Sequence, residues 1–208
     1  MCAPRRPHGA GVVVGPTIEV LLPLTALGYL SGTWLGAITV CRVAGLADPR
    51  LSGSCNPGFS NVLRLHGPVL ALATLTIDAL KGWPVLLLGM HQGLTPWGLG
   101  LVGLGVLLGH CYPAWYRFRG GKAVASAFGV MLLLTPGVAL SCAVIWGLLA
   151  WRVHTAAVAS LTSATLAPLL SLWLSPDFAW VVLVFAALVL ARHALNIDRL
   201  RRGKEPRL

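Results

Sequence analysis

The residues from Leu51 to Arg64, LSGSCNPGFSNVLR, form the longest polar, turn-forming run between two strongly apolar segments. The glycines and proline of this run exclude an ordinary helix and permit tight turns. Such turns can direct several backbone N–H groups into one concavity. The polar side chains available around it are Ser54, Asn56, Ser60, Asn61 and Arg64. Backbone donors and a permanently charged guanidinium suit a phosphate group. The run therefore predicts a phosphate site; the alternative is a solvated turn between two membrane helices.

A second cluster is the basic loop FRGGKAVAS, which joins a Gly-Gly turn (Gly120 and Gly121) to the start of an apolar helix. Free N–H groups, the positive end of the helix and the ammonium of Lys122 would converge there, which favours phosphate binding. The loop is not a Walker A motif, because Tyr116 stands at the first glycine position and Ala123 follows the lysine. The alternative is an interfacial anchor, with Lys122 extending its ammonium to the membrane surface.

Two opposite charges, Asp78 and Lys81, lie three residues apart within an apolar run and therefore on one helical face. A charge at the centre of a bilayer costs roughly 2.5–3.5 kcal/mol on insertion scales, so the two should pair or face a polar cavity. We interpret them as a structural ion pair; a direct role in catalysis is the alternative. If residues 68–77 lie along the membrane surface instead, both charges would be close to the headgroups and to the site.

Histidines near the ends of apolar runs are further candidates. His110, in GHCYP, has the position of a hydrogen-bonding residue at a helix end. His193 and Asn196 are three residues apart, on one face of the predicted last helix. Both side chains can form hydrogen bonds with a hydroxylated substrate, or they can orient one another.

The composition indicates an all-α polytopic membrane protein. Of the 208 residues, 56% are hydrophobic and only 11% are charged, with a mean hydropathy of +0.78. Soluble domains carry about 25% charged residues. Several apolar runs reach the roughly 20 residues that a membrane-spanning helix requires. The length permits one bundle, so residues 1–208 are predicted to form a single integral membrane domain.

The net charge of +10 is compatible with membrane topology signals, anionic lipid headgroups or an anionic substrate. Of the partners that a basic chain can have, nucleic acid is the least favoured and none is predicted, because the sequence offers no soluble basic face. The five cysteines are scattered, odd in number and without a CxxC motif, so we expect neither a disulfide framework nor a metal site. The first residues contain no AxA-like cleavage site, so no removable signal peptide is expected.

About seven transmembrane helices follow from the apolar runs, some of them short or broken. A break at Thr135-Pro136-Gly137 divides the long run that precedes Arg152. The predicted spans are 16–43, 68–90, 97–115, two short helices within 123–151, 155–174 and 175–197. Residues 1–15 and 200–208 are expected to be flexible.

The basic residues alternate with the spans. Thirteen of them lie in the segments 42–64, 117–122, 152 and 192–207, whereas the turns 91–96, 135–137 and 174–177 hold none. By the positive-inside rule, the thirteen are cytoplasmic. The C-terminus is then cytoplasmic, the N-terminus lies outside, and every polar cluster opens on the cytoplasmic face.

Five ordered blocks of the sequence resemble those of the bacterial PlsY family, the acyl-phosphate:glycerol-3-phosphate acyltransferases. SGSCNPGFSNVLR resembles the family signature GSGNxGATNxxR. The other blocks are DALKG, GHCYP, FRGGKAVAS and the terminal RHALNIDRLRRGKEP. The resemblance covers about residues 25–207 and implies a seven-helix integral membrane fold with its active site at the cytoplasmic face.

The resemblance also implies roles for individual residues. Ser54, Arg64 and Lys122 would hold phosphate groups, and His193 and Asn196 would contact glycerol 3-phosphate. These five are the candidate catalytic residues, and Asp78, Lys81 and His110 are candidate supporting residues. Thr155 matches a serine of the family's polar break. The full set of candidate substrate-binding residues is Ser54, Asn56, Gly58, Asn61, Arg64, Gly120, Gly121, Lys122, Thr155, His193 and Asn196.

The chain departs from the family pattern at Cys55 and Ala123, which replace glycines, and at Phe59-Ser60, which replace Ala-Thr. The first helix also lacks the proline that the family has in a GSIPFG-like segment. Cys55 and Ala123 add Cβ atoms where the family's glycines predict a positive φ or a close approach of the backbone to phosphate. A divergent paralogue with reduced activity therefore remains an alternative.

By resemblance, the reaction is acyl transfer from an acyl phosphate to the 1-hydroxyl of sn-glycerol 3-phosphate, giving lysophosphatidic acid and phosphate without a cofactor. It would be the first acylation of phospholipid synthesis, at the bacterial cytoplasmic membrane, linked functionally to an enzyme that forms acyl phosphate. The alternative is a small transporter of a phosphorylated anion, suggested by the intramembrane charges and broken helices, although the sequence shows no inverted repeat.

The chain offers no Ser-His-Asp or Cys-His arrangement, so no acyl-enzyme is expected. His193 is the candidate base, and a proton acceptor on the donor phosphate is an equal alternative.

Overall fold

The structure is a computed structural model that describes residues 18–208; the segment 1–15, expected to be flexible, lies outside these residues. The described chain is helical throughout and contains no strand. Its α-helices are α1 (Ile18–Gly32), α2 (Gly36–Val43), α3 (Phe59–His66), α4 (Pro68–Leu80), α5 (Trp83–His91), α6 (Pro96–Cys111), α7 (Val124–Leu134), α8 (Pro136–Val153), α9 (Ala156–Leu174), α10 (Ala179–Arg192) and α11 (Ala194–Arg201). Three 3₁₀ turns, η1 (Pro49–Leu51), η2 (Ala114–Tyr116) and η3 (Pro176–Phe178), complete the described elements.

Seven segments of the described chain are candidates to cross or enter a membrane. Four are long and apolar enough to be single spans, namely Pro68–His91, Pro96–Tyr116, Pro136–Val153 and Ala156–Leu174. Two are bent pairs, α1 with α2 (40°) and Pro176–Arg192 with α11 (53°), and the seventh is the short apolar helix α7. The predicted all-α, multi-pass bundle of about seven helices, some short or broken, is confirmed.

The breaks have identifiable causes. Pro84 lies in the first turn of α5, where it lacks an N–H and its ring excludes continuation of α4. At the end of α10, the ring Nδ1 of His193 bonds to Val189 O (2.8 Å), while its backbone N–H bonds to Leu190 O. A side chain inserted into the i→i−4 ladder bends a helix. The predicted last helix, 175–197, is therefore divided at His193 into α10 and α11.

Glycines allow the closest helix contacts. α1 packs along α6, and a Cβ on Gly32 or Gly109 would overlap backbone atoms of the other helix. On α7, a Cβ at Gly129 would overlap the backbone of Ala79 in α4. Small residues bring membrane helices close enough for tight van der Waals packing. α7 is thereby fixed against α4, which sets the position of the loop that precedes it.

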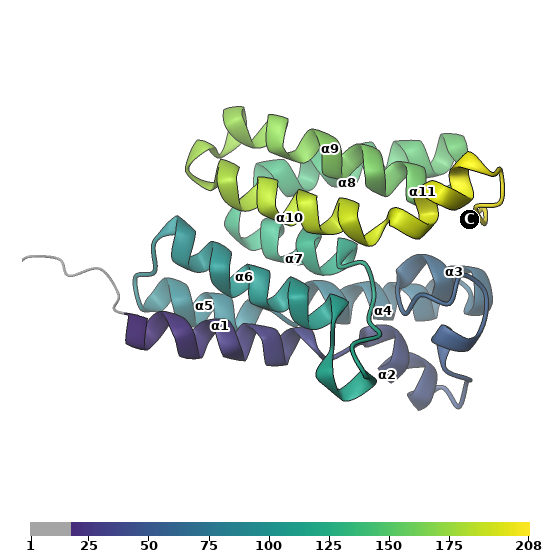
Figure 1. The fold of residues 1–208 in the computed structure, drawn as a ribbon, viewed down its shortest axis with the longest axis horizontal. Helices are drawn as coiled ribbons and strands as arrows, with labels where there is room; N and C mark the ends of the chain where they lie inside the picture. Colours follow the sequence, from purple (N-terminus) through teal and green to yellow (C-terminus); the bar gives the residue numbers. More distant parts are fainter. Residues whose placement is uncertain (1–17) are drawn as a thin grey trace, which may run out of the picture.

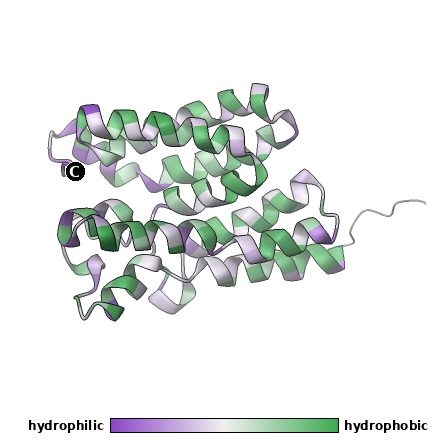
Figure 2. Ribbon diagram, turned by 180° about the vertical axis from the view of Figure 1, so that it is seen from behind, coloured by the Kyte–Doolittle hydropathy of each residue, from purple (hydrophilic) through white to green (hydrophobic). Residues whose placement is uncertain are grey.

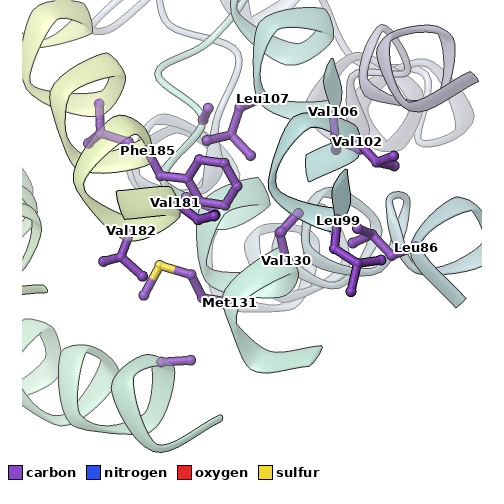
Figure 3. Close-up of a cluster of buried hydrophobic side chains, with 14 of the residues drawn as sticks. Leu86, Leu99, Val102, Val106, Leu107, Val130, Met131, Val181, Val182 and Phe185 are labelled. Carbon is purple, nitrogen blue, oxygen red and sulfur yellow. The ribbon is translucent and has the colours of Figure 1, made fainter. Parts of the chain in front are cut away.

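The core lies where α5, α6, α7 and α10 meet. Figure 3 shows Phe185 of α10, Leu107 of α6 and Val130 of α7 within one apolar cluster, together with Leu86 of α5. Phe185 is the largest of the fully buried side chains. This core connects the half of the bundle made by α1 and α4–α6 to the half made by α8–α10 (Figure 1).

The polar segments gather at one end. In Figure 1, α3, α11 and the C-terminus lie at the same end, opposite the α5–α6 and α9–α10 turns. Figure 2 shows mostly hydrophobic helices with hydrophilic residues concentrated near the C-terminal end. Segments separated by more than a hundred residues in the sequence are therefore available to build one site.

Candidate functional site

A cavity of about 310 Å³ lies among α3, α7, α8, α9 and α10 and is bordered by the loop before α3 and by the C-terminal tail. Most predicted residues line it, although they come from distant parts of the chain: Ser54, Asn56, Gly58, Asn61, Arg64, Asp78, His110, Lys122, His193 and Asn196. The cavity therefore joins both candidate phosphate clusters with the pair on the last helix.

Asn61 holds the loop of residues 49–58 in shape. Its Oδ1 accepts a hydrogen bond from Ser54 N (2.8 Å), and its Nδ2 donates to Pro49 O (2.8 Å) and Ser52 O (3.2 Å). The side chain is 1% exposed. We expected Asn61 to bind substrate, but its amide is engaged with the loop backbone. Its contribution is to fix Ser54 at the cavity wall.

Cys55 and Ala123 both occupy the left-handed region, each with φ = 58°. The expectation that the family's glycines stand at positions of unusual backbone conformation is confirmed for both residues. A left-handed conformation costs a residue with a Cβ roughly 1–2 kcal/mol. Both residues are next to a candidate phosphate ligand, Ser54 or Lys122, so the strain lies at the site itself.

Arg64 is on the last turn of α3 and extends into the cavity. Its Nε donates to the backbone oxygen of Arg207 (2.6 Å). Its Nη1 is buried and has no hydrogen-bond partner among residues 18–208. An unpaired guanidinium nitrogen in a cavity is a donor that an anionic ligand can satisfy.

The Gly-Gly turn differs from the prediction. The N–H of Gly120 donates to Cys111 O (3.2 Å) and the N–H of Gly121 to His110 O (3.0 Å). These N–H groups are therefore not free for phosphate, because they satisfy the unpaired carbonyls at the end of α6. Neither glycine lines the cavity. A Cβ on Gly121 would overlap the ring of His110, so the glycines serve close packing.

The predicted positive helix end is present. α7 begins at Val124 without a side-chain cap, and Val124 and Ala125 line the cavity. The first N–H groups of a helix have no intrahelical partners and favour an anion. Of the N–H groups expected to bind phosphate, those of α7 are available and those of the turn are not.

Lys122 brings an ammonium to this helix end. Burial, together with the nearby Arg64, Arg199 and Arg192, lowers the pKa of Lys122 to about 8, although Glu205 opposes the shift. A cation held among other cations is poised for an anionic partner. Arg192 stabilises the loop that carries Lys122, because its Nε donates a hydrogen bond to Gly121 O (3.1 Å).

Asp78 and Lys81 form the predicted ion pair (3.0 Å), with side chains 1% and 0% exposed. The Lys81 ammonium uses its other two donors on Trp34 O (2.8 Å) and His110 Nδ1 (2.7 Å). Because the ring of His110 packs under Gly121, the pair supports the loop that presents Lys122. Asp78 and His110 also line the cavity wall.

His193 and Asn196 are both buried at the bend between α10 and α11. A carbonyl oxygen can only accept, so the contact from His193 Nδ1 to Val189 O requires the proton on Nδ1. Nε2 is then the acceptor nitrogen. Asn196 donates from Nδ2 to Glu205 Oε1 (2.6 Å).

Thr155 is not brought to the cavity wall. Its hydroxyl donates to Val153 O (3.2 Å), and the residues that follow it, Ala156 and Ala157, line the cavity instead.

Glu205 was missed in the sequence, since residues 200–208 were expected to be flexible. In the structure, the tail returns to the bundle, and Leu208 N donates to His154 O (2.8 Å). Glu205 lines the same cavity as the two candidate phosphate ligands and accepts a hydrogen bond from Asn196. The available signal was that it is the single acidic residue in the basic tail RLRRGKEPRL.

The inner part of the cavity is apolar, and sequence reasoning did not find it. Its wall comes from four helices and consists mainly of small and aromatic side chains: Phe128, Met131, Ala139, Ala143, Trp146, Ala156, Ala157, Ala164, Ala167, Val182, Phe185 and Val189. Trp146 meets Phe59 edge to face (centroids 6.0 Å apart) and donates to Ser160 Oγ (2.9 Å). Small residues on α8 and α9 had no signal in the sequence beyond general apolarity.

Comparison with known proteins gives a consistent result. The model of the glycerol-3-phosphate acyltransferase family matches residues 22–203. The glycerol-3-phosphate acyltransferase of Chromohalobacter salexigens is 60% identical over 190 residues, covering 90% of this chain and 93% of the relative. That of Pasteurella multocida is 43% identical, covering 88% and 90%.

Two crystal structures of PlsY, an integral membrane glycerol 3-phosphate acyltransferase, are similar to the whole bundle. The glycerol 3-phosphate form has a TM-score of 0.82 at 33% identity, covering 90% of this chain and 95% of that one. The lysophosphatidic acid form has a TM-score of 0.81 at 32% identity, with the same coverage. Motif order, helical architecture and these similarities agree, and the chain belongs to the PlsY family of glycerol-3-phosphate acyltransferases.

Proposed function

We propose that this acyltransferase moves an acyl group from an acyl phosphate to the 1-hydroxyl of sn-glycerol 3-phosphate. The products are 1-acyl-sn-glycerol 3-phosphate, which is lysophosphatidic acid, and inorganic phosphate. The acceptor is supported by the family and by the related crystal structures with glycerol 3-phosphate and lysophosphatidic acid.

The observation that carries the proposal is the two-part character of a single cavity. Its outer part presents Arg64, Lys122 and the start of α7, and its inner part is apolar. An acyl phosphate has the same two parts, an anionic head and an apolar chain. The unpaired Nη1 of Arg64 supplies a donor that a phosphate oxygen would satisfy.

The reaction needs little activation, because an acyl phosphate is a mixed anhydride with a good leaving group. The 1-hydroxyl oxygen bonds to the acyl carbon, the bond from that carbon to the phosphate oxygen breaks, and phosphate leaves with the electron pair. Arg64 and Lys122 would balance the charge on phosphate, while the cavity holds the hydroxyl near the carbonyl. Positioning and charge stabilisation of this kind can supply much of a rate acceleration.

The proton of the attacking hydroxyl has two possible acceptors, the Nε2 of His193 and an oxygen of the donor phosphate. Nε2 is available because Nδ1 carries the proton in its bond to Val189 O. The variant His193→Gln separates the two. It should abolish kcat if His193 is the base and chiefly raise KM if His193 positions the acceptor.

No covalent intermediate is proposed. Two hydroxyls on the inner wall, Ser160 and Ser163, are bonded to Trp146 Nε1 and Cys142 O rather than to a histidine. Among the described residues, no hydrogen bond joins a serine or cysteine of the cavity to His193 or His110. A nucleophile without an adjacent base is weakly activated.

The location is part of the proposal. We place the enzyme in the bacterial cytoplasmic membrane with the site at the cytoplasmic face, where soluble glycerol 3-phosphate would have access. The thirteen basic residues, which lie in alternate polar segments of the sequence, support this orientation. An enzyme that forms acyl phosphate is the expected functional partner, because the donor must be made before this step.

The test is the donor specificity of purified protein in detergent. Acyl phosphate with glycerol 3-phosphate should give lysophosphatidic acid and one phosphate per acyl group transferred, whereas acyl-CoA as sole donor should give no product. Full activity with acyl-CoA, or an acyl group trapped covalently on the protein during turnover, would contradict the proposal.

A further inference from the structure

We propose that Glu205 determines acceptor specificity: one carboxylate oxygen orients Asn196, and the other accepts a hydrogen bond from the non-reacting 2-hydroxyl of glycerol 3-phosphate. This inference rests on the proposed function for the identity of the acceptor. Its test measures binding of the acceptor in the absence of an acyl donor. The inference about Glu205 and the proposed acyl-transfer reaction can therefore be refuted separately.

The two oxygens of Glu205 have different environments. Oε1 accepts the hydrogen bond from Asn196 Nδ2 (2.6 Å). Oε2 is buried and has no partner among the described residues. The carboxylate lines the cavity, so a ligand can reach this unpaired acceptor. A buried acceptor without a partner has lost its water, and a hydroxyl donor would satisfy it.

The contact with Asn196 also fixes the amide. Only the amino group of an amide can donate to a carboxylate, so Nδ2 must face Glu205. Oδ1 of Asn196 is then left as an acceptor, and no hydrogen bond within residues 18–208 uses it. The tail thus presents acceptor oxygens from two residues, which suits a ligand with hydroxyl donors.

The position of Glu205 selects the 2-hydroxyl. Arg64 Nε donates to the backbone oxygen of Arg207, two residues after Glu205, and Glu205 lines the same cavity as Arg64 and Lys122, the cations assigned to phosphate. In glycerol 3-phosphate, C2 is one carbon nearer to the phosphate than C1. A carboxylate close to the phosphate ligands therefore meets the 2-hydroxyl first and leaves the 1-hydroxyl for the acyl carbon.

This arrangement predicts which acceptors the site rejects. A carboxylate oxygen only accepts, so it binds a secondary alcohol and repels the keto oxygen of dihydroxyacetone phosphate. It also loses its partner with 3-hydroxypropyl phosphate, which lacks the 2-hydroxyl. A site built to bind a hydroxyl discriminates strongly, because its buried polar group is otherwise unpaired.

The experiment is calorimetric binding of these three phosphates to the detergent-solubilised protein. The wild-type protein should bind glycerol 3-phosphate about 10-fold to 150-fold more tightly than either analogue, the range for a hydrogen bond to a charged group. Equal affinity of the wild-type protein for glycerol 3-phosphate and 3-hydroxypropyl phosphate would overturn the inference, with no variant required.

The variant Glu205→Gln makes the test specific. Its carboxamide can still accept from Asn196 and then presents an NH₂ donor, which suits a keto oxygen. The preference for glycerol 3-phosphate over dihydroxyacetone phosphate should fall by about 10-fold or more. A residue that only neutralises cations or only anchors the tail would change both affinities equally, and an unchanged ratio would overturn the inference.

A matched control is Asp198→Asn. Asp198 lies on the adjacent helix α11 and pairs with Arg202, but its side chain is 52% exposed. Its removal should leave the affinity ratio unchanged. A ratio that falls as far in this variant would contradict a specific role for Glu205.

Discussion

At the scale of single residues, Arg64 and Lys122 are the two cations that we propose bind phosphate. They come from α3 and from the loop before α7, and both line the outer part of the cavity. Arg64 has an unpaired donor, and Lys122 is next to a free helix N-terminus. The two therefore offer different means of binding, a planar fork and a point charge.

We expect Arg64→Ala and Lys122→Ala each to lower kcat/KM by roughly tenfold to more than a hundredfold, corresponding to about 1.5–3 kcal/mol for a charge-assisted contact. Arg64→Lys should remain impaired, because an ammonium cannot replace the fork. Steady-state kinetics on folded variants measures this. The control Arg202→Ala removes an arginine whose side chain is 66% exposed and should be near normal. Near-normal activity of both alanine variants would show that Arg64 and Lys122 only help to orient the protein in the membrane and do not bind substrate.

The lowered pKa of Lys122 predicts an alkaline limit to activity. With a pKa of about 8, the ammonium is present below this pH and is lost as the pH rises through it. Phosphate binding requires the charged form, so kcat/KM should fall above about pH 8. The alkaline decrease in kcat should occur at higher pH than that in kcat/KM, because a bound phosphate group stabilises the ammonium of Lys122.

The control for this limit is Lys122→Arg, since a guanidinium stays charged throughout the range. The alkaline fall in kcat/KM should move to higher pH in the variant, even if its activity at neutral pH is lower. If the wild-type and variant profiles fall at the same pH, another group is responsible.

At the scale of elements, the helix breaks are where the polar groups are made available. The bend at His193 uses a side chain in place of a backbone donor and places Asn196 in the cavity wall. The break between α4 and α5 leaves Lys81 O as an acceptor for the Ser31 hydroxyl. Asp78 Oδ1 accepts from Gly36 N (3.1 Å), at the start of α2. The buried ion pair thus joins three helical segments beneath the Gly-Gly turn.

We expect Asp78→Asn and Lys81→Met each to destabilise the protein by about 3–5 kcal/mol, because each leaves a buried charge without its partner. The double variant should lose less than either single change, since it leaves no unpaired charge. Thermal unfolding of detergent-solubilised protein measures both effects. The exposed pair of Asp198 and Arg202 is the control, and its removal should cost less than about 1 kcal/mol. Additive losses in the double variant would exclude a coupled pair.

At the scale of the whole molecule, one end of the bundle holds α3, α11 and the C-terminus, and the α5–α6 turn is at the other (Figure 1). This separation predicts opposite sides of the membrane for Cys55 and Gln92, both of which are exposed. Two exposed positions in the α5–α6 turn could carry a cysteine for labelling, Gln92 and Gly93. Gln92 is preferable, because the backbone of Gly93 has φ = 71°, a conformation that a cysteine would strain.

An impermeant thiol reagent applied outside intact cells should therefore label Gln92→Cys and not Cys55. The background should carry Cys2→Ser, since an external N-terminus would place Cys2 outside. Cys41 and Cys111 are buried, and permeabilised cells should make Cys55 reactive. Labelling of Cys55 from outside would reverse the topology and remove the site from the cytoplasmic face.

The sequence by itself determined the class of structure and most of the polar residues at the site. Apolar runs of spanning length and the spacing of basic residues are local properties, so they can be counted without a fold. The resemblance to the family, which has glycines where this chain has Cys55 and Ala123, led us to expect the left-handed backbone found at both residues.

Only the tertiary structure decided how these residues are used. Whether the N–H groups of Gly120 and Gly121 are free depends on the end of α6, about ten residues away in sequence but in contact with them. Asn61 was expected at the substrate but is enclosed by its own loop, whereas Glu205 was not expected at the site and is carried back to the cavity by the tail. Hydrogen-bond partners and burial are properties of packing between distant segments, and the pattern of residue types along the chain does not contain them.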